Sequence, residues 1–374
     1  MTNNIEYVEI VATLPYETQQ APITQTTSEP CPAVIGLRTV FITFHAIFTI
    51  LANFVCIYVI RHTNAMSDGA KVFMVSMAVS DLFVGVIAFF SIAPAFLGWW
   101  PWGDSLCIMT AAFVTIFCLT SVSSLMCVSI DRIIAVCNPL RYPSLVTRKR
   151  SLVVTTIVWF SSFSIIAGLW HISPPVEYNN ASVTCAWMWE DDTQCLPVAI
   201  CICLSLFVVP CIIMIVLYLK LFLISQKHVR RIAASSMTPD SIRRSSSQRS
   251  TSSGNRFTND HKAIKMFFVV TFAFTVAWAP YSISSLFGCL TGVTIPEWSK
   301  FLVHWLAFSN SWFNVIIYVC MNTALRNTAV SLLRRNKQCC CGCCDSLNVD
   351  IPAPSTKLVL KTLLTIVSRE ERSK

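Results

Sequence analysis

Residues 114–132 read VTIFCLTSVSSLMCVSIDR, and this stretch decides the fold class of the chain. Seventeen apolar or small hydroxyl-bearing residues run from Val114 to Ile130, and an acid and a base follow at Asp131 and Arg132. A helix needs about 20 mostly apolar residues to cross the hydrocarbon core, and charges are least costly at its ends. The stretch therefore predicts a membrane-spanning helix that ends in a charged pair.

The composition extends this prediction to the whole chain. Of 374 residues, 54% are hydrophobic and 13% are charged, and the mean hydropathy is +0.61, as is typical of membrane proteins. The first 30 residues show no basic segment followed by a short apolar one, so we expect no cleavable signal peptide. We predict an all-α membrane protein, a bundle of seven transmembrane helices within residues 36–321, followed by a short amphipathic eighth helix. The predicted spans are 36–61, 70–96, 104–136, 150–170, 195–226, 260–288 and 298–321.

The distribution of basic residues predicts the orientation. Residues 1–35 contain four glutamates and neither Lys nor Arg, whereas basic residues gather at the opposite ends of the predicted spans. Because Lys and Arg near span ends stay in the cytoplasm, we expect residues 1–35 to form an outer tail, with the C-terminus inside. The net charge of +9 favours membrane lipid and cytosolic partners, and no continuous basic face suggests a nucleic-acid partner.

Residues 227–259 contain IRRSSSQRSTSSGNR, which has too little apolar surface to fold by itself. We predict a flexible cytosolic loop. Arg243 and Arg244 ahead of Ser245 and Ser246 suit a basophilic kinase, and a merely solvated linker is the alternative.

Residues 322–374 combine an amphipathic helix, a cysteine cluster and a cytosolic tail. TALRNTAVSLLRR at 323–335 spaces leucines and arginines as a helix on the inner leaflet would. A disulfide cluster is disfavoured in the cytosol, and the spacing lacks the separated pairs of a zinc site, so we predict thioester lipidation. The candidate cysteines are Cys339, Cys340, Cys341, Cys343 and Cys344.

Two covalent features are predicted outside the membrane. Cys107 begins the third span and Cys185 lies in the outer loop after the fourth, where a disulfide would persist. A second bridge between Cys31 and Cys289 stays open. Asn180 begins the sequence Asn-Ala-Ser in the same outer loop, which makes it a glycosylation acceptor.

Polar residues at bilayer depth are costly and are therefore functional candidates. Asp81 is the one acid in the middle of a predicted span, and hydroxyls and amides of other spans can hold it ionised around a small cation. The alternative is a neutral hydrogen-bonded contact between helices. The expected cluster is Asp81, Ser121, Asn310, Ser311 and Asn314.

The pair Asp131 and Arg132 is a candidate switch. Asp260, just ahead of the sixth span, offers Arg132 a second acid, and a choice between two partners would let that span move. A charged topology anchor is the alternative. Pro210 and Pro280 each remove a helical hydrogen bond and predict kinks.

These residues together resemble the rhodopsin-like (class A) G-protein-coupled receptors over residues 36 to about 340. The resemblance implies an extracellular small-molecule ligand, a heterotrimeric G protein, arrestin and kinases as partners, a sodium site around Asp81 and a Cys107–Cys185 bridge. It also assigns Arg132, Tyr218 and Tyr318 to the switch that opens the cytosolic face. The residues that carry it are Asn53, Asp81, Cys107, Asp131, Arg132, Trp159, Pro210, Tyr218, Trp278, Ala279, Pro280, Tyr281, Asn314 and Tyr318.

Within that family the chain resembles the biogenic-amine and trace-amine receptors, through WLAFSNSWFNVIIY, SDLFVG, DHKAIKM and the Trp100–Gly103 loop. Those receptors hold the ligand's ammonium with an Asp in helix three, braced by a Tyr in helix seven. The matching positions here are Val114 and Phe308, so the amine-binding pair is missing. The same Phe308 replaces the lysine that an opsin requires. The expected pocket lining is Val114, Thr115, Cys118, Trp278, Tyr281, Ser282, His304, Trp305 and Phe308.

Two further departures matter. Ile202, Cys203 and Leu206 stand where catecholamine receptors carry serines, so a catechol would find few hydrogen-bonding groups. Val315 replaces the proline of the family's Asn-Pro-x-x-Tyr motif, so the seventh span should kink less near Asn314.

The expected function is therefore a receptor for a small molecule other than a conventional monoamine. A constitutively active orphan receptor or heteromer partner remains an alternative, and would raise second messenger without ligand. A transporter or channel would show inverted repeats or glycine-broken helices, and the chain has 10 Gly and no repeat. No nucleophile–base pair or metal spacing suggests an enzyme.

Overall fold

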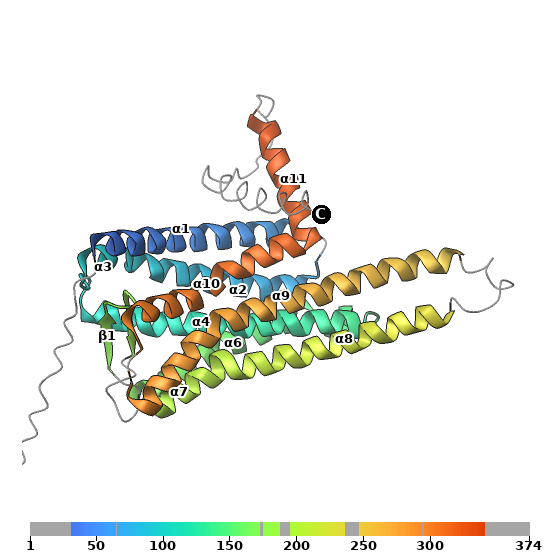
Figure 1. Ribbon diagram of the computed structural model, residues 1–374. Coiled ribbons are helices and arrows are strands. Elements are labelled where there is room, and N and C mark those ends of the chain that lie inside the picture. Colours follow the sequence, from blue (N-terminus) through green and yellow to red (C-terminus); the bar gives the residue numbers. More distant parts are fainter. Residues whose placement is uncertain are drawn as a thin grey trace, which may run out of the picture.

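The computed structural model describes residues 31–64, 66–172, 175–187, 195–235, 247–293 and 295–340. Seven helices in it are long and apolar enough to cross a membrane, which confirms the predicted spans. They lie side by side as one bundle (Figure 1). Their bounds are α1 (Pro32–His62), α2 with α3 (Asp68–Phe90, Ile92–Leu97), α4 (Asp104–Cys137), α6 (Arg148–Leu169), α7 with α8 (Cys195–Cys203, Val209–Ser235), α9 (Ser247–Thr291) and α10 (Glu297–Met321).

Buried polar contacts fasten the bundle at its centre. Trp159 of α6 donates to the Ser76 hydroxyl of α2 at 3.0 Å, and Ser76 meets Ser124 of α4 at the same distance. Asn53 of α1 donates to the Ser311 carbonyl of α10 at 3.1 Å. Such bonds are favourable between membrane helices because hydrocarbon offers no competing partner.

Close helix contact fixes the position of α2 against α1. A Cβ added at Gly85 would lie 2.9 Å from Ile50 of α1, which is closer than side chains pack. Asp81 lies one turn before Gly85 on α2, so this contact helps to set the depth of the acid in the bundle.

One end of the bundle carries a β-hairpin. Strands β1 (Val176–Asn179) and β2 (Thr184–Trp187) pair antiparallel and lie near α3 and α7 (Figure 1). The disulfide between Cys107 and Cys185 joins β2 to the start of α4, as predicted. Tyr178 donates to the Pro94 carbonyl at 3.3 Å, and burial raises the pKa of its phenol to about 12, so the donor proton is retained at physiological pH.

The two prolines are accommodated differently. A π-helical turn at Leu204–Val208 lies between α7 and α8 and ends two positions before Pro210, and the amide of Val209 donates to the Leu204 carbonyl. A π turn widens the helix by one residue and provides for a proline's missing hydrogen bond. Around Pro280, by contrast, α9 continues as a single helix.

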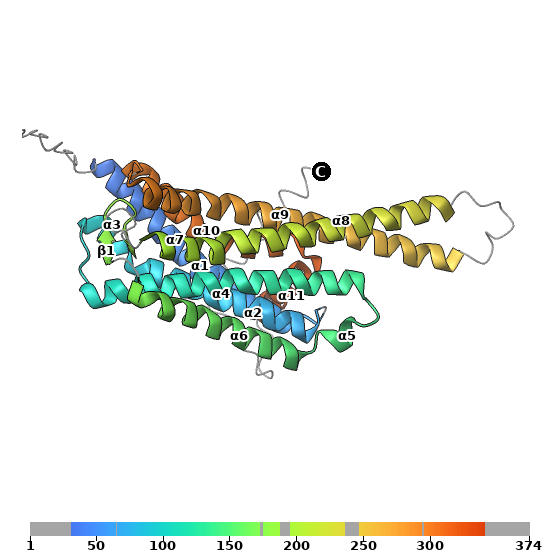
Figure 2. The same cartoon turned by 90° about the horizontal axis from the view of Figure 1, so that it is seen from below.

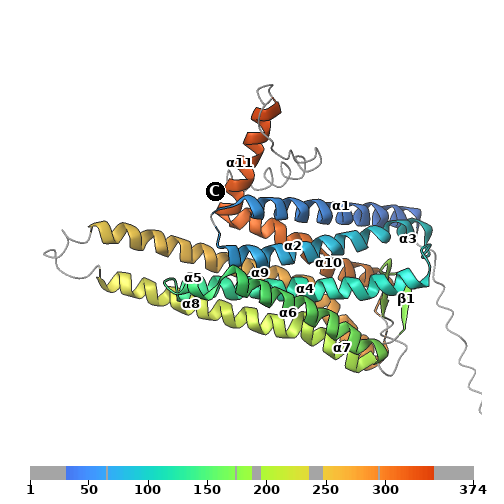
Figure 3. The ribbon, with the colours of Figure 1, turned by 180° about the vertical axis from the view of Figure 1, so that it is seen from behind.

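The opposite end carries the connections expected to be cytosolic. Short α5 (Tyr142–Leu145) lies between α4 and α6, and α8 and α9 project beyond the other helices there (Figures 2 and 3). Helix α11 (Thr323–Cys340) follows α10 after one residue and turns away from the bundle, as the predicted eighth helix (Figure 1). Its Leu325 is 1% exposed, and Thr328 donates to Thr63 beyond α1 at 3.1 Å.

Helix is described at both ends of the segment predicted as a flexible loop, residues 227–259. Helix α8 continues to Ser235 and α9 begins at Ser247, so within this segment only residues 236–246 lie outside the described chain. Each residue added to an existing helix gains a hydrogen bond without a new nucleation cost. A prediction from the low apolar content of the segment does not take this gain into account. Several predicted features lie outside the described residues: the RRSS motif, most of the outer tail, and Cys341, Cys343 and Cys344. The side chains of Cys339 and Cys340 are not described either.

Candidate functional site

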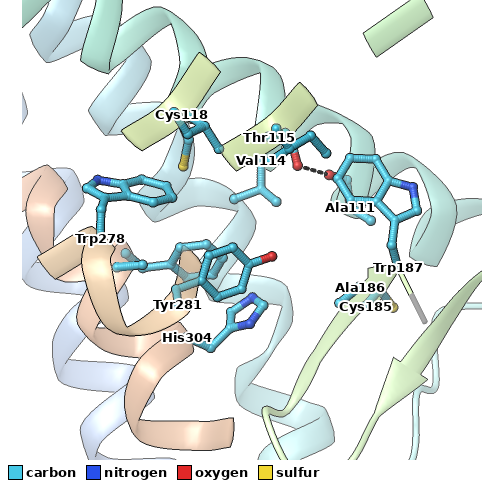
Figure 4. Close-up of a pocket in the computed structure, with 14 residues that line it drawn as sticks. Ala111, Val114, Thr115, Cys118, Cys185, Ala186, Trp187, Trp278, Tyr281 and His304 are labelled. Carbon is cyan, nitrogen blue, oxygen red and sulfur yellow. Dashed lines mark hydrogen bonds between the residues drawn. The ribbon is translucent and has the colours of Figure 1, made fainter. Parts of the chain in front are cut away.

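A cavity lies among α4, α7, α9 and α10 at the end that carries the hairpin. The empty space that its lining residues bound, including space that is open to the solvent, is about 460 Å³. Figure 4 shows Trp278 and Trp187 on opposite sides, with Val114 between them and Tyr281 and His304 below. The lining is Ala111, Val114, Thr115, Cys118, Cys185, Ala186, Trp187, Ile202, Leu206, Trp278, Tyr281, His304, Ala307 and Phe308.

Seven of the nine residues predicted to line a ligand cavity do line this one, and two do not. Trp305 is 1% exposed, packs edge-on against His45 of α1 at 5.1 Å and donates to the Ser182 carbonyl at 2.8 Å. It is one residue after His304, about 100° further round the helix, and therefore faces α1. Ser282 is also buried, but its hydroxyl contacts Cys203 of α7.

The cavity lining is mostly apolar and carries no acid or base other than His304. None of its side chains is Asp, Glu, Lys or Arg. Thr115 uses its hydroxyl inside α4, donating to the Ala111 carbonyl at 2.9 Å. His304 meets Thr184 of β2 at 3.4 Å and packs edge-on against Phe308 and Tyr281. The arrangement provides flat apolar contact with a few hydrogen-bonding groups, as small-molecule cavities do.

The hairpin contributes lining that the sequence did not predict. Cys185, Ala186 and Trp187 all reach the cavity. In a strand, residues two apart share a face, so the disulfide at Cys185 directs Trp187 inward. That pattern is visible in the sequence only once the four residues are known to be a strand.

A second group of polar residues lies deeper. Asp81 is fully buried, accepts from the Ser121 hydroxyl at 2.7 Å and from the Asn314 amide at 3.2 Å, and contacts the Ser311 hydroxyl. Asn310 is buried on α10 but makes no hydrogen bond to Asp81 among those the structure describes. The structure thus brings four of the five predicted residues together.

This cluster has the donor set of a hard monovalent cation. It offers carboxylate, hydroxyl and amide oxygens. The side-chain amide oxygen of Asn53, nearby on α1, is buried without a hydrogen-bond partner. Neither ion pair in the described chain, Lys71–Asp68 or Arg132–Asp131, provides Asp81 with a positive charge. The residues fit a sodium ion held by Asp81 and Ser121, whose charge would compensate the buried acid.

The third group lies at the inner end of α4. Asp131 is 1% exposed and pairs with the neighbouring Arg132. Tyr142 of α5 donates to Asp131 at 2.8 Å and meets Ser67, the N-cap of α2, at 2.7 Å. Because the phenol has one proton, the Ser67 hydroxyl donates to it, which gives a chain of bonds from α2 through Tyr142 to Asp131.

Partial burial raises the pKa of Tyr142, and its hydrogen bond to Asp131 raises that pKa further, against the opposing influence of Ser67. The phenol therefore stays a donor. Neither Tyr142 nor Ser67 was predicted as a site residue, because nothing in their local sequence shows that Tyr142 meets the start of α2.

The other predicted switch residues lie apart from this chain of bonds. Tyr218 packs against Phe222 of its own helix and Phe268 of α9, with ring centres 6.2 and 5.9 Å apart. Tyr318 is 2% exposed in the core. The side chain of Asp260 lies outside the described residues, so its pairing with Arg132 stays a prediction.

Comparison with known proteins gives a consistent family. The model described as "7 transmembrane receptor (rhodopsin family)" matches residues 52–318. The chain is 28% identical to trace amine-associated receptor 9 of Rattus norvegicus, over 76% of this chain and 81% of that one. It is 28% identical to dopamine receptor 1 of Drosophila melanogaster, over 82% and 64% of the two chains. A QRFP-like peptide receptor of Branchiostoma floridae is 26% identical, over 80% and 78%.

Proposed function

The chain belongs to the rhodopsin family of seven-transmembrane receptors, and from that membership we propose a plasma-membrane receptor whose extracellular ligand is a small molecule other than a conventional monoamine. Members of this family are G-protein-coupled receptors and not enzymes, so the inner partner is a heterotrimeric G protein. We further propose an extracellular N-terminus, a ligand site in the cavity beside the hairpin, and arrestin, kinases and membrane lipid as additional partners.

One observation supports the proposed ligand class most strongly. Several relatives are named for amines, yet Val114 and Phe308 line this cavity and no acid does. Val114 and Phe308 are each 8% exposed and belong to one continuous hydrophobic core. A protonated amine placed there would lose its hydration and gain no counter-charge, which is strongly unfavourable.

Two groups of polar residues inside the bundle support a receptor mechanism, one around Asp81 and one at the cytosolic end. We propose that Asp81, Ser121, Asn310, Ser311 and Asn314 hold sodium in the resting state. We also propose that Asp131, Arg132, Tyr218, Asp260 and Tyr318 rearrange when the cytosolic end opens. Breaking the contact of Arg132 with Asp131 would free the arginine for another partner, which is the bistable element such a switch needs.

Restoring the amine pair tests the proposed ligand class. We expect the double variant Val114→Asp/Phe308→Tyr to gain at least a tenfold response to monoamines such as phenethylamine or dopamine, since a well-placed ion pair contributes more than about 1.4 kcal/mol. The measurement is second-messenger output for several G-protein classes at matched surface expression. Val114→Asn/Phe308→Tyr, which has similar bulk without the charge, is the control. An unmodified receptor that responds to these amines as well as the double variant does would refute the proposal.

A further inference from the structure

The outer hairpin places one aromatic side chain inside the cavity. Trp187 is the last residue of β2, follows Cys185 on the same strand face and is 5% exposed. It belongs to the same buried cluster as Val114, Ile202 and Leu206. A side chain from an extracellular loop is thus buried as deeply as the transmembrane core.

Three separate contacts hold the hairpin in this position. The Cys107–Cys185 disulfide joins it to α4. On α10, Trp305 donates to the Ser182 carbonyl at 2.8 Å, and His304 meets the Thr184 hydroxyl at 3.4 Å. The hairpin is therefore fastened on both sides of the cavity mouth.

The backbone between these contacts is strained. Val183 has φ 59°, in the left-handed region that a β-branched residue rarely adopts, yet it is 2% exposed in the core. Such strain persists only where surrounding contacts fix the conformation. Burial of Val183 and Trp187 compensates for the strained turn, so the indole is a structural part of the cavity wall.

The wall beside Trp187 suits a flat ring. In Figure 4 the indole lies next to Ala111 and Thr115 of α4, and Ala186 is adjacent in the strand. Small side chains at these positions leave a space the indole fills. No charged side chain faces that space, so it accepts a neutral aromatic ring and disfavours a cation.

We propose that the cavity contains a binding subsite for a neutral, indole-sized aromatic ring, and that Trp187 occupies this subsite as a tethered ligand. A free molecule of the same chemical class binds there only when Trp187 is absent or displaced. Acting as a tethered ligand, Trp187 supports the basal second-messenger output of the receptor. This signalling assignment rests on the proposed receptor function, whereas occupancy of the subsite does not.

Chemical rescue tests the subsite directly. Removing a buried ring leaves a dry apolar space that can bind a free ring of the same shape. We expect indole to raise the thermal midpoint of purified Trp187→Ala receptor by about 2 to 4 °C, with no shift in the unmodified chain. Tryptamine, which adds an ammonium group, should give no rescue.

The matched control is Trp170→Ala. Trp170 lies in the short helical turn after α6 and is 43% exposed, so its removal deletes an indole without opening an enclosed space. Indole should not shift this variant. An equal shift in the unmodified chain, no shift in folded Trp187→Ala, or equal rescue by tryptamine would overturn the proposal.

Poor folding of Trp187→Ala is itself informative. Indole in the growth medium should then restore its surface display, while Trp187→Phe, which keeps most of the ring, needs no addition. Absence of rescue alongside normal display of Trp187→Phe contradicts the proposal. If indole stabilises Trp187→Ala without restoring basal second-messenger output to the unmodified level, the signalling assignment fails and the subsite stands.

Discussion

At the residue scale, the phenol of Tyr142 links two helices through one acid. Its bonds to Asp131 and Ser67 lie at the inner end of α4, beside the pair of Asp131 with Arg132. The carboxylate accepts a hydrogen bond from Tyr142 and forms an ion pair with Arg132, so it holds the arginine at this end of α4. We therefore propose that Tyr142 helps to keep the cytosolic end in a closed, resting state.

Removing that hydroxyl should loosen the closed state. Tyr142→Phe loses a hydrogen bond to a carboxylate, which contributes about 1 kcal/mol after allowance for partial exposure, so we expect basal second-messenger output to rise roughly fivefold. Ser67→Ala should act in the same direction, more weakly. Tyr58→Phe, near the inner end of α1 and outside this chain of bonds, is the control. Basal output of Tyr142→Phe equal to that of the control would contradict this role.

The buried acid Asp81 gives a prediction about ion dependence. A sodium ion that binds only the folded resting state stabilises it by mass action, so replacing potassium with sodium should raise the thermal midpoint of the purified receptor by a few degrees. Asp81→Asn should abolish that difference, because the amide keeps the shape and loses the charge. Asp68→Asn, at the exposed start of the same helix, should retain it. A sodium effect that survives in Asp81→Asn would assign the ion elsewhere.

Sequence reasoning identified residues well where chemistry alone marks them. Asp81, Asp131 and the cysteine pair were conspicuous because charge at bilayer depth is costly and outer cysteines oxidise. Val114 and Phe308 were assigned to the cavity by resemblance, and the structure places both there. Trp305 could not be placed, since its direction depends on the helical rotation of α10 against α1.

At the element scale, α10 departs from the family pattern at Val315. The helix runs unbroken from Glu297 to Met321. In a continuous α-helix the amide of Val315 bonds to the Ser311 carbonyl, and that carbonyl also accepts from Asn53 at 3.1 Å. The bond from α1 would keep the carbonyl satisfied if the helical one were lost.

Restoring proline should therefore be less harmful than in an ordinary helix. Proline in a helix interior costs about 3 kcal/mol, and we expect Val315→Pro to cost less than this as long as Asn53 is present. In an Asn53→Ala background the same change should cost about 1 to 2 kcal/mol more, as a thermal-unfolding double-mutant cycle would show. Val315→Ala, which keeps the amide, is the control in both backgrounds. Additive effects would mean that Asn53 does not compensate.

A helix could be predicted from the sequence where its own residues show a characteristic pattern. The seven spans and the amphipathic helix come from runs of apolar residues, and the structure contains them. The hairpin did not come from such a pattern, because four-residue strands are fixed by a disulfide and by contacts with α10. The inner extensions of α8 and α9 were missed since their composition is that of a linker.

At the scale of the whole molecule, the two ends have different chemistry. The hairpin end has a disulfide and exposed Trp99 and Trp102, whereas the other end has the Asp131–Arg132 pair and amphipathic α11. Indole rings suit the membrane–water boundary, and disulfides persist outside the cell. We therefore propose that the hairpin end lies outside the cell, which is the orientation expected from the basic residues.

Glycosylation offers a direct test of that orientation. Asn180 is exposed in the hairpin turn, where its carbonyl also accepts from Arg38. We expect Asn180→Gln to shift the receptor to a lower apparent mass on a gel, matching glycosidase-treated unmodified protein. The side chain lies outside the helices, so surface display should persist. An unmodified receptor insensitive to glycosidase, at normal surface display, would count against the predicted acceptor.

The π-helical turn at Leu204–Val208 has an evolutionary consequence. Its extra residue lies between the segment that carries Ile202 to the cavity and the segment anchored at Pro210. Gain or loss of one residue there rotates the upper segment by about 100° and leaves the lower segment in register. Ligand selectivity can therefore diversify by a single insertion or deletion while the apparatus that meets the G protein is inherited unchanged.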